Sequence, residues 1–165
     1  MQVGFFLLPK SETAFLLEEY TLRQALEKMQ YHGYMSVPLL NQDGQYVGTV
    51  TVGDLLWYIK DKHRLDISAK EEGQQSASEQ CLDISAAEKV LLKEIPRRRD
   101  NIPVGINADM CDLLQTAMVE NFIPVVDDSG VFIGIITRRE ILKFCSGDTI
   151  LRELEQKFLR KQEDD

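Results

Sequence analysis

The sequence lacks a long apolar run, since none of its 165 residues belongs to a stretch approaching the roughly 20 apolar residues of a transmembrane helix. Its N-terminus, residues 1–10, is apolar only over a short distance. That segment has neither a basic leader nor a small-residue cleavage site, so it predicts a first β-strand and not a signal peptide. We expect a protein that does not enter the membrane.

The sequence also has few residues that carry metal or nucleophilic chemistry. Its cysteines are Cys81, Cys111 and Cys145, an odd number without a C-x-x-C pair, and its histidines are His32 and His63. This pattern supports neither a disulfide framework nor a zinc site, and reduced thiols in the cytoplasm are the simplest account. Because neither histidine adjoins a serine or cysteine motif, we expect no catalytic residues, no metal and no enzyme activity.

Basic residues are fewer than acidic residues. The 19 Lys and Arg residues are outnumbered by 27 Asp and Glu, which gives a formal net charge of −8. General nucleic-acid binding requires a basic surface that displaces counterions, so it is not expected. A small anionic ligand is still allowed, because positive charge can be concentrated in one cleft.

What the sequence does contain is a repeat. Residues 37–56 align without a gap to residues 123–142, so that Pro38 corresponds to Pro124, 86 positions later. The proline, both glycines, the threonine and the final leucine coincide, and apolar positions match apolar positions. The duplication predicts two strand–turn–strand–helix halves that share a core and form related sites.

The first half contains clear element signals. Thr21 and Gln24 form a capping box for a helix over residues 20–31, and Gly33 ends it. Asp43-Gly44 between two apolar runs predicts a turn. The elements expected are a helix over 20–31, strands over 35–40 and 46–50, and a helix from Val52 to about Lys60, followed by a polar linker.

The second half is expected to repeat this order. A capping box at Ser85-Ala86-Ala87-Glu88 predicts a helix through Val90, Leu91 and Leu92, closed by Pro96, and Ile102-Pro103-Val104 predicts a strand. A helix capped by Asn107 would then present Met110, Leu113, Leu114, Ala117 and Met118 on one face, and a last helix would begin at Asp148. The boundaries expected are repeat 1 at 1–62, a linker at 63–84, repeat 2 at 85–145 and a C-terminal helix at 146–165.

Each repeat ends with a Thr-x-x-acid motif at the start of its last helix, Thr51-x-x-Asp54 and Thr137-x-x-Glu140. One interpretation is a capping box, in which threonine and acid satisfy the free amides of the first turn. The other, compatible with it, is nucleotide binding. A helix N-terminus attracts phosphate, while a carboxylate accepts hydrogen bonds from ribose hydroxyls.

The two motifs differ at the two positions that lie between the threonine and the acid. Arg138 and Arg139 occupy the second copy, where Val52 and Gly53 stand in the first. Two guanidinium groups in a first helical turn oppose the helix dipole unless an anion binds them, and Arg suits bidentate phosphate contact. A solvated pair is the alternative. We therefore expect two unequal sites, with the stronger phosphate site in the second repeat.

The repeated pattern h-P-h-h-(D/N)-x-x-G-x-h-h-G-h-h-T-x-x-(D/E)-h-h resembles a pair of cystathionine-β-synthase (CBS) domains over nearly the whole chain up to Cys145. The resemblance implies an α/β (α+β) fold of two pseudo-symmetric β-α-β-β-α repeats in one Bateman-type module. It also implies adenosine-containing ligands in clefts between the sheets and pairing into a homodimer. By position, the implied nucleotide-binding residues are Asp54 and Glu140 for ribose, Thr51 and Thr137 for ribose or phosphate, and Tyr34, Ser36, Ile102, Val104 and Phe122 around the base.

The chain is similar in particular to stand-alone bacterial CBS-pair proteins that bind cyclic di-AMP. It departs from the family pattern in having Glu140 in place of the commoner aspartate, and Gly53 in place of a longer side chain. The expected function is regulatory: an adenine nucleotide (cyclic di-AMP, AMP or ATP, with S-adenosylmethionine also open) binds without a tightly bound cofactor and signals to an unidentified protein. The alternative is a constitutive interaction subunit without a functional nucleotide site.

Overall fold

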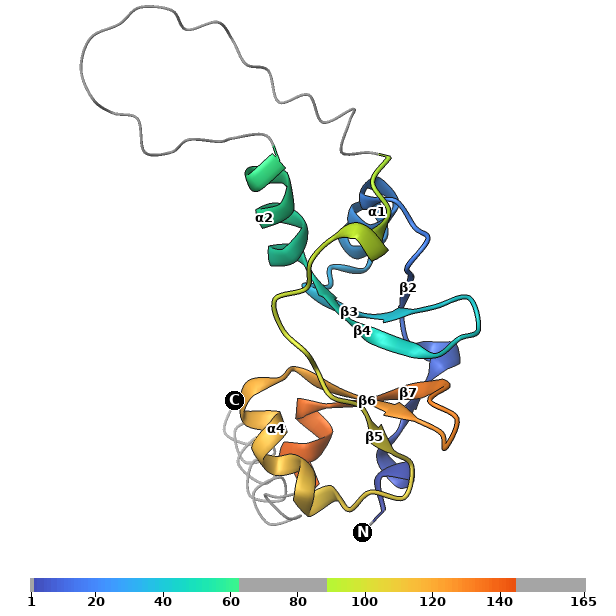
Figure 1. The fold of residues 1–165 in the computed structure, drawn as a ribbon. Helices are drawn as coiled ribbons and strands as arrows, with labels where there is room; N and C mark the ends of the chain where they lie inside the picture. The colour runs from blue at the N-terminus through green and yellow to red at the C-terminus, as the bar shows by residue number, and fades with distance from the viewer. Residues whose placement is uncertain (1, 63–88, 145–165) are drawn as a thin grey trace, which may run out of the picture. The chain divides into compact units, whose positions relative to one another are not determined.

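The computed structural model describes residues 2–62 and 89–144 of the chain. The chain divides into two compact units, one of residues 14–100 and one of residues 1–13 together with 101–165 (Figure 1). Each unit contains its own hydrophobic core and one copy of the repeated hairpin. The expected linker at 63–84 and the helix expected from Asp148 lie outside the described residues.

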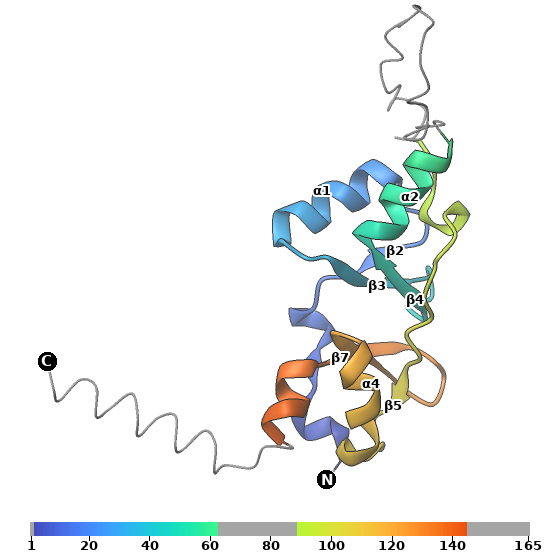
Figure 2. The same cartoon turned by 90° about the vertical axis from the view of Figure 1, so that its left-hand side faces the viewer.

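The unit of residues 14–100 is a three-stranded sheet with two helices on one face (Figures 1 and 2). Strand β2 runs parallel to β3, and β3 runs antiparallel to β4 with Pro38 opposite Thr49. The elements are β2 (Leu16–Leu17), α1 (Leu22–His32), β3 (Ser36–Leu40), β4 (Tyr46–Thr51), α2 (Val52–Lys62) and the 3-10 turn η3 (Leu92–Glu94).

Local sequence explains most boundaries in this unit. Thr21 caps α1 by accepting from the backbone N–H of Gln24, and the Gln24 side chain accepts from the Thr21 N–H, which confirms the predicted capping box. Gly33 ends the helix at a φ of 68°, in the left-handed conformation that glycine adopts without steric cost. Gly44 has a φ of 78° in the predicted turn between β3 and β4.

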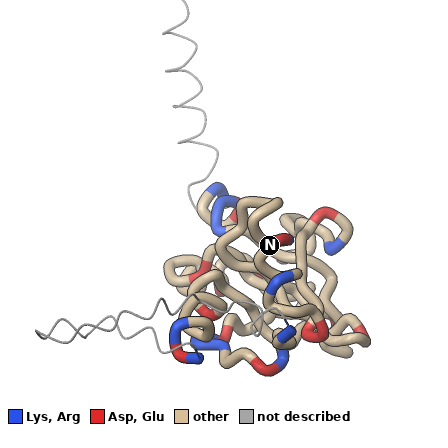
Figure 3. Tube along the Cα trace, turned by 90° about the horizontal axis from the view of Figure 1, so that it is seen from above, with Lys and Arg blue, Asp and Glu red and all other residues tan. Residues whose placement is uncertain are grey.

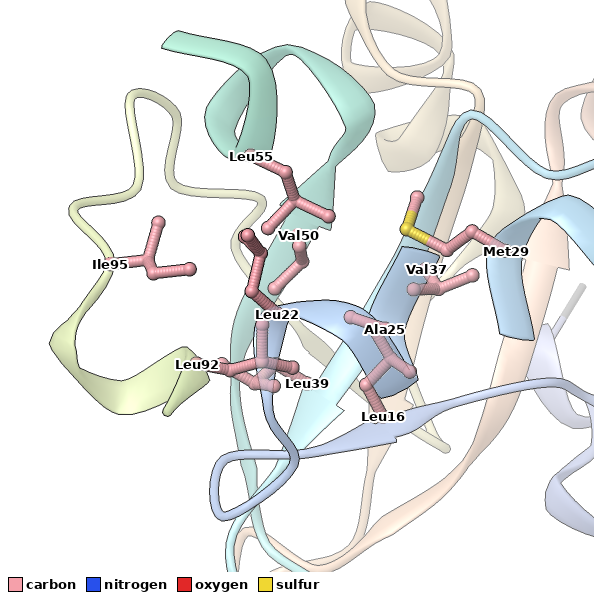
Figure 4. Packing of buried hydrophobic residues seen from close by; sticks show 10 residues of the cluster. All are labelled: Leu16, Leu22, Ala25, Met29, Val37, Leu39, Val50, Leu55, Leu92 and Ile95. Carbon is pink, nitrogen blue, oxygen red and sulfur yellow. The ribbon is translucent and has the colours of Figure 1, made fainter. Parts of the chain in front are cut away.

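The core of this unit lies between its helices and its sheet, and it also receives Leu92 and Ile95 from the later segment (Figure 4). These two side chains are 1% and 4% exposed. Figure 4 shows Leu92 close to Leu22 and Leu39, so residues distant in sequence complete the first core.

The prediction of a helix through residues 90–92 is wrong. The Leu22 N–H donates to the Val90 carbonyl at 2.8 Å, and the Leu92 N–H donates to the Tyr20 carbonyl at 2.9 Å. Leu91 forms an antiparallel bridge with Thr21, and η3 follows. Because these backbone groups bond to the segment before α1, they cannot form helical bonds, and tertiary pairing overrides local helix propensity here. The expected start of this helix, residues 85–88, lies outside the described residues.

The other unit is a four-stranded sheet in the order β1-β7-β6-β5, with α4 beside the helical residues 138–144 (Figures 1 and 2). In the hairpin, Pro124 lies opposite Ile135. The elements are η1 (Val3–Phe6), β1 (Leu8–Pro9), η2 (Lys10–Glu12), β5 (Val104–Gly105), η4 (Met110–Leu113), α4 (Leu114–Val119), β6 (Phe122–Val126), β7 (Phe132–Thr137) and the helical residues 138–144.

The helix expected after Asn107 begins later and is wound differently. Asp109, not Asn107, is the cap, and its carboxylate accepts from the Cys111 N–H at 2.9 Å. The first turn, η4, is a 3-10 helix with about 3.0 residues per turn, so the inward face is shifted relative to an α-helix from the start. Leu114 and Met118, expected on the buried face, are therefore 40% and 80% exposed.

Strand β5 is also displaced from the expected strand over 102–104. Ile102 is 73% exposed, and Pro103 carries no N–H for a strand ladder. Pairing begins only at Val104, opposite Val125.

The second glycine of each hairpin lets another segment cross closely. Gly48 has a φ of 155°, and a side-chain carbon there would lie 2.6 Å from the Nε atom of Arg97. The equivalent Gly134 has a φ of 159° and lies opposite Pro9 in the sheet, where the same carbon would overlap the Leu8 carbonyl oxygen. A different segment therefore crosses each hairpin. The side chain of Arg97 approaches the first hairpin, and the backbone of Leu8 approaches the second.

Candidate functional site

The first Thr-x-x-acid motif is a complete capping box at the start of α2. The Thr51 Oγ1 atom accepts from the Asp54 N–H at 3.1 Å. The Asp54 Oδ2 atom accepts from the Thr51 N–H at 3.0 Å and from the Thr51 hydroxyl at 2.7 Å. The bonds are reciprocal, so the capping interpretation holds for this copy.

Asp54 is also bonded to a distant part of the chain. Its Oδ1 atom accepts from the Arg98 N–H at 3.1 Å. The Arg98 guanidinium lies over the Trp57 ring, 5.2 Å from its centroid, and one of its nitrogens is 3.9 Å from an Asp61 carboxylate oxygen. Asp54 is only 5% exposed. A pocket of about 280 Å³ lies beside these contacts, lined by Asp54, Trp57, Tyr58, Asp61, Lys62, Pro96 and Arg98.

The residues expected around a base in the first repeat are only partly gathered at this motif. Ser36 lies directly opposite Thr51 in the β3–β4 pair. Tyr34 precedes β3, is 47% exposed, and stacks on His32 with a centroid separation of 5.4 Å and an interplanar angle of 6°. Its ring therefore packs on a neighbouring surface side chain.

The second motif is more open than the first. The Thr137 Oγ1 atom accepts from the Glu140 N–H at 3.4 Å, a longer bond than its counterpart. In the described part of the chain, the Glu140 carboxylate does not return a bond to Thr137. Instead its Oε1 atom accepts from Lys143 Nζ at 2.6 Å, and the Glu140 side chain is 36% exposed. This carboxylate can reach a ligand without breaking a capping box.

The two arginines of the second motif have different surroundings. The Arg138 Nε–H donates to the Glu120 carbonyl at 3.0 Å, and its backbone N–H donates to the Asn121 carbonyl at 2.9 Å. These bonds hold Arg138 against the segment that precedes β6. Arg139 is exposed. One guanidinium is thus held in position and the other is open to solvent.

The predicted base-contacting residues of the second repeat are dispersed. Phe122 lies opposite Thr137 in the sheet and is 7% exposed, and its carbonyl accepts from the buried Asn101 side chain at 2.9 Å. Val104 packs against the core of its unit. Ile102 is mostly exposed. Phe122 therefore lies next to the motif along the hairpin, whereas Val104 pairs with Val125 farther along β6 and Ile102 precedes β5.

Arg98 and Lys143 are not among the residues expected from the sequence to neighbour the two acids. Lys143 follows Glu140 by three positions in a helix, a spacing at which opposite charges pair, so a signal for it was present. Arg98 is 44 residues from Asp54, and no local pattern indicates that its backbone N–H reaches a carboxylate.

Other classes of site are not supported by the described residues. Over 2–62 and 89–144, no group of three or more His, Cys, Asp or Glu side chains is placed to hold a metal ion. Within the same ranges, no helix is long and apolar enough to span a membrane. Figure 3 shows Lys and Arg on several separate segments with acidic positions among them.

Comparison with known proteins gives a consistent result. Cyclic di-AMP receptor B from Bacillus subtilis (strain 168) is 26% identical over 141 residues, covering 86% of this chain and 84% of that protein. A crystal structure of CbpB in complex with c-di-AMP matches 95% of this chain and 91% of its own, with a TM-score of 0.71 at 20% identity. CBSX2 in complex with AMP matches 86% of this chain and 93% of its own, with a TM-score of 0.62 at 20% identity.

The family model for the CBS domain matches twice, at residues 8–61 and 92–147. Together these ranges cover more than half of the chain and contain both hairpins and both Thr-x-x-acid motifs. The solved structures share the mixed α/β fold of a CBS pair. The chain belongs to the CBS domain family.

Proposed function

We propose that this chain is a regulatory CBS-pair module that binds an adenine nucleotide, foremost cyclic di-AMP, on its second motif and passes the bound state to a protein partner. The observation that carries the proposal is the placement of Arg138, Arg139 and Glu140 at one helix start, with the Glu140 carboxylate outside a capping box.

The electrostatics of this helix start favour an anion. Backbone N–H groups of a first turn carry partial positive charge, and Arg138 and Arg139 add two formal charges there. The Arg138 bond to the Glu120 carbonyl uses one of the five donors of its guanidinium. The remaining donors, together with those of the exposed Arg139, suit the oxygens of a phosphate.

The acid of the motif suits the sugar. A carboxylate facing phosphate would be repelled, whereas it accepts readily from ribose hydroxyls. We assign Glu140 to ribose, Thr137 to ribose or phosphate, and Phe122, Ile102 and Val104 to the surroundings of the base. Thr51, Asp54, Tyr34 and Ser36 are the corresponding residues for a nucleotide on the first motif, which we take to be the weaker site.

Relatives support the choice of ligand. One is named a cyclic di-AMP receptor, and similar folds have been solved with c-di-AMP and with AMP. We place cyclic di-AMP first, with AMP or ATP as the alternatives. We further propose that the module is a cytoplasmic, non-catalytic homodimer. Nucleotide binding would change its affinity for the partner by a coupling free energy of about 1–3 kcal/mol.

A melting-temperature screen tests the proposal. Wild type is compared with Arg139→Ala in the presence of cyclic di-AMP, AMP, ADP, ATP, S-adenosylmethionine and cyclic di-GMP. Arg99→Ala is the matched control, since Arg99 is an exposed arginine of the other unit. A ligand at 100 times its Kd adds about 2.7 kcal/mol to the free energy of unfolding.

We expect an adenine ligand to stabilise wild type and Arg99→Ala while Arg139→Ala responds weakly. Absence of a shift with every nucleotide would remove the sensor proposal and leave the constitutive interaction subunit. An equal shift of melting temperature in Arg139→Ala would show that the nucleotide binds elsewhere than at the second motif.

A further inference from the structure

The acid of the first motif accepts several hydrogen bonds from within its own compact unit. Asp54 accepts three hydrogen bonds, two at Oδ2 from Thr51 and one at Oδ1 from the Arg98 N–H, while being 5% exposed. A carboxylate offers about four acceptor positions. One position is left, on a side chain that is almost entirely enclosed.

Two ribose hydroxyls need two acceptor positions. The two bonds from Thr51 are local and form the cap of α2, so their loss would weaken the start of that helix. The bond from Arg98 joins segments 44 residues apart and is independent of the cap. It is the contact that a ribose can replace while leaving the helix intact.

We propose that the Arg98 N–H competes with nucleotide for the Asp54 carboxylate. The Asp54–Arg98 hydrogen bond would keep nucleotide from the first motif until a nucleotide displaces the Arg98 N–H. The inference rests on the proposed function, and it describes how its weaker site is regulated. Displacement moves residues 96–100 away from the start of α2, and this segment leads directly into the other compact unit at Asn101. Occupancy of the first motif is thereby converted into a movement of the backbone.

The side chain of Arg98 sets the strength of this competition. Its guanidinium is held over the Trp57 ring at 5.2 Å and lies 3.9 Å from Asp61. A cation over tryptophan is attractive even at an exposed site. Removing the Trp57 ring therefore loosens the segment without altering Asp54, Thr51 or the Arg98 backbone donor. Arg98→Pro removes that donor directly.

The second motif has no equivalent competitor among the described residues. The Glu140 carboxylate bonds to Lys143 on its own helix, and the side chain is 36% exposed. The two motifs should therefore bind with different affinities even though their sequences align. The difference arises from the Arg98 contact as well as from Arg138 and Arg139.

The test is calorimetric titration of the full chain with cyclic di-AMP and with AMP, in an Arg139→Ala and Glu140→Gln background that removes the open guanidinium and the ribose carboxylate of the second motif. Trp57→Leu and Arg98→Pro are each added to this background. Tyr31→Leu is the matched control, because Tyr31 is an exposed aromatic residue of α1 in contact with His32 and not with Arg98. The amide resonance of Arg98 is followed in parallel with ¹⁵N-labelled protein.

Arg98→Pro should raise first-motif affinity about tenfold, as expected for the loss of one competing hydrogen bond to a charged group. Trp57→Leu should raise it about twofold to fivefold, as expected for the loss of one exposed cation–π contact, while Tyr31→Leu leaves it unchanged. In the Arg139→Ala and Glu140→Gln protein, the Arg98 amide resonance should shift as the first motif binds nucleotide. Unchanged affinity in both loosened variants overturns the proposal, as does first-motif binding with an unmoved Arg98 resonance. If Arg98→Pro does not fold, the first-motif affinity of Trp57→Leu alone decides whether the proposal holds. A wild-type protein that binds neither nucleotide removes the proposed function itself, a separate result.

Discussion

The matched glycines Gly48 and Gly134 provide the sharpest test of how the two hairpins are built. Both have a positive φ, 155° and 159°, and each lies in the second strand of its hairpin. Alanine at either position adopts a backbone conformation that L-residues rarely occupy, at a cost of about 1–3 kcal/mol. The backbone contribution should therefore be similar in the two variants.

The obstacle that each new methyl group meets is different. At Gly48 it meets the Arg97 side chain at 2.6 Å, and an arginine side chain can move aside. At Gly134 it meets the backbone carbonyl of Leu8, whose strand pairs with β7 through Pro9 and Gly134. Losing this pairing costs at least about 1–2 kcal/mol more, at about 1 kcal/mol for each backbone hydrogen bond.

We therefore expect Gly48→Ala to reduce the free energy of unfolding by about 1–3 kcal/mol and Gly134→Ala by about 2–5 kcal/mol, with the Gly134 loss the larger of the two. Urea titration of the ligand-free protein measures both values, and amide exchange assigns each loss to its compact unit. Adding Arg97→Ala should recover part of the Gly48→Ala loss. Equal losses at the two glycines, or no effect of Arg97→Ala on the Gly48 variant, would refute the proposed difference between the obstacles.

Two further predictions concern the cap and the core. Thr51→Ala should cost about 0.5–2 kcal/mol in urea unfolding, because it removes a reciprocal capping box, and Thr137→Ala should cost less, because its single bond is 3.4 Å long. A larger loss at Thr137 would contradict the described difference between the motifs. Leu92→Ala should cost about 2–5 kcal/mol, because the side chain is 1% exposed within the first core. Its exposed neighbour Lys93 should tolerate alanine within about 0.5 kcal/mol, and a similar small loss for Leu92 would show that residues 90–95 do not belong to that core.

The parts of the fold that sequence could predict depend on short-range chemistry. The Thr21–Gln24 capping box, the end of α1 at Gly33 and the turn at Gly44 each follow from two to four neighbouring residues. The repeat itself predicts that the same hairpin forms twice, and both hairpins are present. In these segments local preference and tertiary structure agree.

The parts that sequence could not predict depend on distant partners. Residues 90–92 have helical signals, but their backbone groups bond to Tyr20 and Leu22. At the candidate site, the Thr-x-x-acid spacing identified both acids but not the difference between them. Asp54 is enclosed by a bond from Arg98, 44 residues away, whereas Glu140 pairs with a lysine on its own helix. No pattern within either motif specifies the Arg98 contact.

Nucleotide binding at the second motif is tested by the affinity of cyclic di-AMP for wild type and for Glu140→Gln, measured by calorimetry at fixed salt. Glu140 lies in a partly exposed pair with Lys143, so the substitution should change the ligand-free melting temperature little. Wild type should bind cyclic di-AMP, and Glu140→Gln should bind it about tenfold or more weakly, the effect of losing a charged hydrogen-bond acceptor. Equal affinities, or a wild-type protein that binds no adenine nucleotide, would contradict nucleotide binding at the second motif.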